Sequence, residues 1–125
     1  MGALCVSPPG AYQVVRFGGV AWSPNGDRLA YALFDDSSKS SSICIVNSDG
    51  SNPVKLTTTQ YDPFPFTTDN GDTSPSWSPD GSKIAFSRRI DRKNYIYIMN
   101  ADGTDQVRLT QGTQPAWQPV PVPLP

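Results

Sequence analysis

The chain has 125 residues, the size of one ordinary domain with a modest hydrophobic core. Thirteen prolines and ten glycines, with acidic residues that are all aspartate, indicate many turns and almost no helix. Ten basic and eleven acidic residues give a net charge of -1, which excludes a strongly basic nucleic-acid-binding protein.

The composition also restricts catalysis. The sequence has no histidine and no glutamate, which excludes Ser-His-Asp and Cys-His catalysis and every histidine-containing zinc site. It has neither a glycine-rich phosphate loop nor a Gly-x-Ser-x-Gly elbow. We therefore expect no enzyme, and no catalytic, cofactor-binding or metal-binding residue.

The sequence contains no apolar stretch near the roughly 20 residues that cross a bilayer, so no membrane insertion is expected. The start of the chain lacks the basic region and the long apolar region of a signal peptide. The chain is therefore either cytoplasmic as given, or its export signal lies on a part not present here.

Strand segments and turn signals alternate along the chain. After Trp22, an Asn25-Gly26 pair indicates a tight hairpin turn, since both residue types tolerate positive φ. The strand that follows, 29–33, places large residues on one face and two alanines on the other. Small residues on one face would let a neighbouring sheet pack closely against it.

The next strand, 43–46, is apolar throughout and is followed by an Asp49-Gly50 turn. It contains Cys44, one of the two cysteines of the chain. We expect Cys5 and Cys44 to be unpaired thiols, because a cysteine in a buried strand behaves as a small hydrophobic residue. The alternative is a Cys5–Cys44 disulfide.

The second half of the chain holds four more strand segments separated by turn signals. The predicted strands are Pro75–Ser78, Lys83–Ser87, Tyr95–Asn100 and Gln106–Thr110. Asp80-Gly81 and Asp102-Gly103 are the turn pairs of the two hairpins. An aspartate in such a turn ordinarily accepts hydrogen bonds from its own backbone, so we interpret Asp80 and Asp102 as structural.

These segments form an internal repeat. "AWSPNGDRLAYA" from Ala21 aligns with "SWSPDGSKIAFS" from Ser76, and the segment from Ile43 matches that from Ile96 at 8 of 15 positions. A further copy begins around Trp117. Four short antiparallel strands per repeat make a propeller blade.

We therefore predict an all-β fold, a partial β-propeller of about two four-stranded antiparallel blades plus flanking strands, as one domain over 1–125. Blade one spans about 20–57 and blade two about 75–110. The first strand of a further blade spans about 114–119.

The segment "WSPDGSKIAFSR…YIYIMNADGTDQVRLT" resembles the WD-related (WD40-like) repeat of TolB-like propellers. The resemblance implies the fold, and it is compatible with periplasmic scaffold proteins, with gating domains of serine peptidases and with some polysaccharide lyases. Family members close six or seven blades into a ring. We therefore expect a C-terminal fragment of a larger propeller, which the proline-rich end favours, or a unit that self-associates to complete a ring.

Two features of the insertion between the blades could bind a ligand. Asp62, Asp69, Asn70 and Asp72 could hold calcium, but they lack the order of a known calcium loop, so a polar turn is the favoured interpretation. The insertion also carries three aromatic residues among prolines, Tyr61, Phe64 and Phe66. They either contact a partner or fold back over the blade ends.

Up-and-down topology places all four Asn/Asp-Gly turns at one end of the blades. The longer connections, Phe34–Ser42, Thr58–Ser74 and Arg88–Asn94, then lie at the opposite end, where length and variation favour binding. The last of them contributes a basic group, Arg88, Arg89, Arg92 and Lys93. A solvated hairpin is favoured over a phosphate site, and an acidic protein is the more natural partner.

The tryptophans Trp22, Trp77 and Trp117 recur at one repeat position, and we interpret them as packing residues between strands and blades. The sequence therefore predicts a non-catalytic protein-binding or scaffold module. The alternative is an accessory propeller piece of a serine peptidase or carbohydrate-active enzyme whose catalytic residues lie elsewhere.

Overall fold

A computed structural model describes residues 17–35, 40–57, 71–90 and 92–117. These ranges contain eight strands and no helix, so none of the described residues forms a membrane-spanning helix. The strands are β1 (Phe17–Trp22), β2 (Arg28–Asp35), β3 (Ser40–Asn47), β4 (Val54–Lys55), β5 (Gly71–Trp77), β6 (Lys83–Ile90), β7 (Lys93–Asn100) and β8 (Val107–Gln111).

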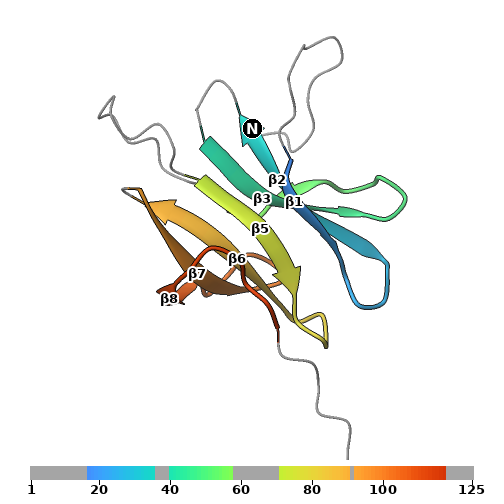
Figure 1. Ribbon diagram of the computed structural model, residues 1–125. Helices are drawn as coiled ribbons and strands as arrows, with labels where there is room; N and C mark the ends of the chain where they lie inside the picture. Colours follow the sequence, from blue (N-terminus) through green and yellow to red (C-terminus); the bar gives the residue numbers. More distant parts are fainter. Residues whose placement is uncertain (1–16, 36–39, 58–70, 91, 118–125) are drawn as a thin grey trace, which may run out of the picture.

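The strands form two antiparallel four-stranded units, β1–β4 and β5–β8, which we call blade one and blade two (Figure 1). A single parallel bridge, between Ser41 and Gly71, joins them into one open sheet. At this bridge a side chain on Gly71 would collide with Ser41, so the close approach of the two blades requires glycine. The fold is the all-β partial propeller that the repeat predicted.

The short turns confirm the structural interpretation of their aspartates. The Asp80 carboxylate accepts hydrogen bonds from the Ser82 backbone N–H at 3.0 Å and from the Ser78 hydroxyl at 2.7 Å. The Asp102 carboxylate accepts the Thr104 N–H at 3.0 Å. Each carboxylate therefore accepts a hydrogen bond from a backbone N–H that has no backbone acceptor within the turn.

The main hydrophobic core lies between the blades. Ala30, Ala32 and Ile43 of blade one are fully buried, and they share one cluster with Ile84 and Phe86 of blade two. Because the alanines add little thickness, the larger residues of blade two can reach the sheet of blade one. The alternation of large and small residues in β2 therefore has the packing role that the sequence predicted.

Two local predictions need correction. Cys44 is disulfide-bonded, so the preference for unpaired thiols is wrong; Cys5, the other cysteine, lies outside the described residues. β5 begins at Gly71, four residues before the predicted strand, because its first residues pair with the end of β6. Residues 114–117 form no strand and 118–119 lie outside the described residues, so the first strand of a further blade stays a prediction.

Candidate binding surface

The basic group of the β6–β7 hairpin divides into one internal residue and an exposed tip. Arg88 forms a two-point ion pair with Asp72, Nε to Oδ1 at 2.8 Å and Nη2 to Oδ2 at 3.0 Å. The guanidinium also lies 4.5 Å from the ring centre of Tyr97 and donates to Gln106 Oε1 at 3.0 Å. Arg88 therefore joins β5, β6 and β7 within blade two.

Electrostatics favour the charged form of the Arg88 guanidinium. Burial alone lowers the pKa of the Arg88 guanidinium, but the hydrogen bonds and charge of Asp72 outweigh it, so the pKa lies above its ordinary value. The Asp72 carboxylate has no exposed surface. A buried two-point pair of this kind fixes geometry as well as charge.

The ion pair also bears on the calcium interpretation. Asp72 belongs to β5 rather than to a loop, and both of its carboxylate oxygens are bound by Arg88. The described ranges contain no group of three or more potential metal-ligating side chains. Asp62, Asp69 and Asn70 lie outside the described residues.

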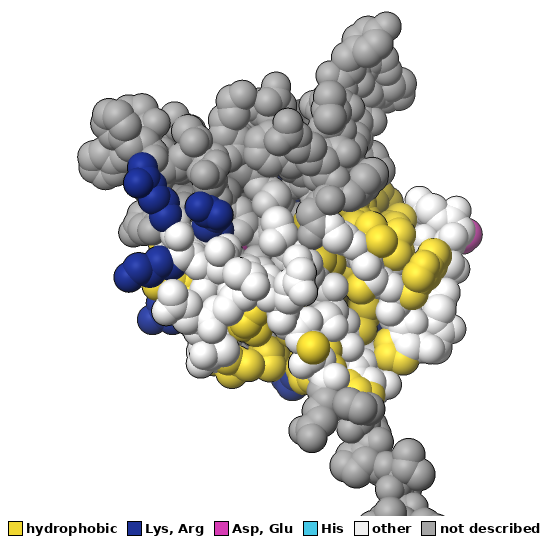
Figure 2. Space-filling model, viewed as in Figure 1, with side chains coloured by type: hydrophobic (Ala, Val, Ile, Leu, Met, Phe, Trp, Pro, Cys, Tyr) yellow, Lys and Arg dark blue, Asp and Glu magenta, His cyan; other side chains and the backbone are white. Residues whose placement is uncertain are grey.

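The exposed tip of the hairpin is formed by Arg92 and Lys93, with the partly exposed Arg89 beside them. Arg92 has a φ of 67°, which turns the chain between β6 and β7. Figure 2 shows basic side chains gathered on the side of the molecule where β6, β7 and β8 lie in Figure 1. The predicted aromatic contacts Tyr61, Phe64 and Phe66 lie outside the described residues, and the partner-binding role of the whole set stays a prediction.

The strand ends follow the predicted division between the two ends of the blades. In Figure 1 the β5–β6 turn and the β1–β2 turn lie toward the bottom, whereas β6 ends and β7 begins at the upper left. β2 ends and β3 begins at the top of the same view. The basic tip therefore lies away from these two short turns. The predicted longer connection Arg88–Asn94 is itself short, because β6 extends to Ile90 and β7 begins at Lys93.

A groove that sequence reasoning missed opens between the blades at the short-turn end. Its volume is about 500 Å³. Ile45, Val54 and Leu56 of blade one and Ala101 of blade two supply apolar atoms to its wall, and Asn100 and Asp102 of blade two supply polar atoms. No motif marks this groove, because its two walls come from different repeats.

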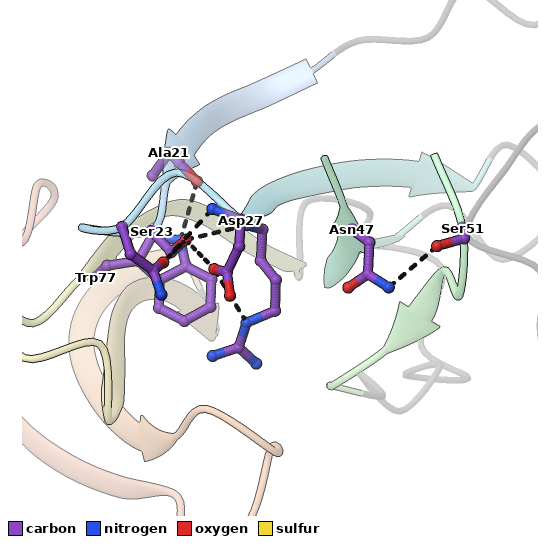
Figure 3. A network of polar contacts seen from close by, with 8 residues as sticks. Ala21, Ser23, Asp27, Asn47, Ser51 and Trp77 are labelled. Atoms are coloured by element: carbon purple, nitrogen blue, oxygen red, sulfur yellow. Dashed lines mark hydrogen bonds and ion pairs between the residues drawn. The ribbon is translucent and has the colours of Figure 1, made fainter. Parts of the chain in front are cut away.

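The tryptophans connect successive repeats by one recurring hydrogen bond. Trp77 Nε1 donates to the carbonyl of Ala21 at 2.9 Å (Figure 3), and Trp117 Nε1 donates to the carbonyl of Ser76 at 2.8 Å. In both cases the acceptor is the residue just before the tryptophan of the preceding repeat. The packing interpretation is confirmed for Trp77, which is 7% exposed.

No protein-family model matches the chain. The chain is 30% identical over 112 residues to dipeptidyl-peptidase 5 of Porphyromonas endodontalis, an alignment that covers 85% of this chain and 15% of that protein. TolB from Acinetobacter baumannii superposes with a TM-score of 0.58 at 21% identity, covering 77% of this chain and 21% of that structure.

An acylaminoacyl peptidase in complex with Z-Gly-Gly-Phe-chloromethyl ketone superposes with a TM-score of 0.52 at 19% identity. That match covers 78% of this chain and 14% of the peptidase. The chain therefore has a TolB-like β-propeller fold, and it spans less than a third of the length of each protein compared.

Proposed function

We propose that this chain is a non-catalytic protein-binding module, a piece of a TolB-like propeller whose β6–β7 hairpin contacts an acidic protein surface. The exposed pair Arg92 and Lys93 is the observation that carries the proposal. Two adjacent cations on a tight hairpin offer a charged contact at low conformational cost, because flanking strands hold their backbone. A scaffold role is compatible with the fold that the chain shares with TolB.

The use of the other polar side chains supports a binding role over a catalytic one. Asp80 and Asp102 are occupied in turn hydrogen bonds, and Asp72 is bound to Arg88. The absence of histidine from the sequence removes the usual general base. The disulfide at Cys44 fits an oxidising compartment outside the cytoplasm, as in a periplasm.

A second candidate function is an accessory propeller piece of a peptidase. It is favoured by the similarity to dipeptidyl-peptidase 5 and to the acylaminoacyl peptidase. In that case the catalytic residues would lie on a different part of a longer protein. Both candidates predict that this chain alone hydrolyses no peptide substrate, and hydrolysis above the buffer rate would contradict both.

The binding proposal is tested with an immobilised oligoglutamate peptide as an acidic probe. The wild-type chain should bind at low salt and be released as salt rises, because exposed charges are screened. The double variant Arg92→Glu/Lys93→Glu should lose this binding. Lys55→Glu/Lys83→Glu, which makes the same charge change away from the hairpin, should retain it. Equal losses in both double variants would show attraction by net charge alone and would contradict the proposal.

A further inference from the structure

Blade two buries a row of three apolar residues against blade one. Trp77 pairs with Ile84, and Ile84 pairs with Met99, so the three side chains lie side by side on one face of the blade. Their exposed fractions are 7%, 0% and 0%. The alanine and isoleucine side chains of blade one cover them, together with the carbonyl that accepts the Trp77 N–H.

Blade one carries the same row at the same register. Trp22 pairs with Leu29, and Leu29 pairs with Val46. This row, which we call the docking row, faces away from blade two and is open: Trp22 is 56% exposed, while Leu29 and Val46 are partly exposed. Figure 2 shows hydrophobic side chains gathered over the strands of blade one. The docking row is thus half of a joint whose complete form is seen inside the molecule.

Blade two carries the other half of the joint on its outer face. Leu109 stands at the repeat position of Leu56, which packs into the inter-blade core, yet Leu109 is 57% exposed. Val107 beside it is 54% exposed. Ile96 and Ile98 correspond to the isoleucines Ile43 and Ile45 of the buried joint, and both are only partly buried. We call Ile96, Ile98, Val107 and Leu109 the docking face.

We propose that a second copy of this chain occupies the docking row, so that the chain assembles head to tail, the docking row of one copy on the docking face of the next. The internal joint between blades one and two is the template, because each half of it is repeated, with exposed side chains, on the opposite outer side of the described part of the chain. Such a contact is heterologous, so it extends beyond a dimer into a ring or an open chain.

One hydrogen-bond acceptor that the second copy needs is already occupied within the chain. Trp117 already donates to the Ser76 carbonyl, the acceptor that an incoming Trp22 would use by the template. Docking therefore exchanges one indole for another at this carbonyl. Removal of the Trp117 side chain by Trp117→Ala should lower the concentration at which the chain assembles, and an unchanged or higher concentration would overturn the exchange.

The test is light scattering of the purified 125-residue chain over rising concentration. The wild type should gain mass beyond a dimer, whereas Trp22→Ala and Leu109→Asp should each remain monomeric. Both side chains are more than half exposed, so both variants should fold, which a thermal melt checks. Val54→Ser, which removes an exposed apolar side chain from the groove inside the molecule, should assemble as the wild type does.

Mixing the two monomeric variants tests the head-to-tail geometry. Trp22→Ala keeps an intact docking face and Leu109→Asp keeps an intact docking row, so an equimolar mixture should form a one-to-one dimer and stop there. A monomeric wild type, or a mixture without dimer, would overturn the proposal. The docking surfaces do not include Arg92 or Lys93, so this assay and the oligoglutamate assay can fail independently.

Discussion

Two glycines at the same repeat position offer a matched test of the joint between the blades. Gly50 in blade one has a φ of 87° and Gly103 in blade two a φ of 89°. A Cβ atom at Gly50 would meet nothing within 4 Å, whereas one at Gly103 would lie 2.8 Å from the backbone oxygen of Leu56. The two substitutions by alanine therefore share a backbone cost and differ in one contact.

The magnitudes follow from these two contributions. Alanine in the left-handed region costs roughly 1–2 kcal/mol at either site. Overpacking against backbone that cannot rotate away adds about 1–3 kcal/mol at Gly103 alone. We therefore expect Gly103→Ala to lower the free energy of unfolding by about 1–3 kcal/mol more than Gly50→Ala.

Urea-induced unfolding of both variants and of the wild type measures the difference. A comparable slope of unfolding free energy against urea would show that all three chains expose the same surface. Equal destabilisation by the two substitutions would mean that the β7–β8 turn does not rest on Leu56, and the packing of the blades described above would be refuted.

Three further predictions concern the polar contacts. Asp72→Asn should destabilise the chain by roughly 3–5 kcal/mol, because it leaves the Arg88 charge buried without its partner. The double variant Asp72→Leu/Arg88→Met should cost less, because it removes both charges. A double-mutant cycle by urea unfolding measures both effects. Trp77→Phe should cost about 1–3 kcal/mol by removing the indole donor to the partly buried Ala21 carbonyl. Trp22→Phe at an exposed site should stay within about 0.5 kcal/mol in the same assay. Hydrogen bonds from Ser78 and Ser82 lower the pKa of Asp80 from 3.8 to about 2, so its stabilising contribution is complete above the first value and is lost as pH falls toward the second. Thermal melts of Asp80→Asn should therefore lose less stability over that acidic interval than melts of the wild type, and identical pH profiles would contradict the assignment.

Much of the fold could be predicted from the sequence because the repeat shows it twice. The Asp-Gly pairs at 80–81 and 102–103 mark turns whose geometry few other residues tolerate, and the structure has hairpins at both. Small and large residues alternate strictly along β2, so Ala30 and Ala32 mark the face of blade one that carries small side chains. Both alanines are fully buried there.

The remaining features depend on contacts between segments that share no local signal. Asp72 and Arg88 lie on two different strands and are 16 positions apart in the sequence. Because no local pattern links them, the sequence places the aspartate in a polar loop and the arginine in a solvated hairpin. Cys44 has the neighbours of a buried thiol whether or not it is bonded, so strand pattern alone cannot reveal its disulfide. The inter-blade groove arises only when two repeats stack.

Amide hydrogen exchange of the chain with and without the oligoglutamate peptide tests the central claim, that the basic hairpin is a protein-binding surface. We expect slower exchange on binding at Arg89 and at the tip formed by Arg92 and Lys93, and no change in the turns at 48–53 and 101–106. Protection centred on those short turns, or none at the hairpin, would contradict the proposed function.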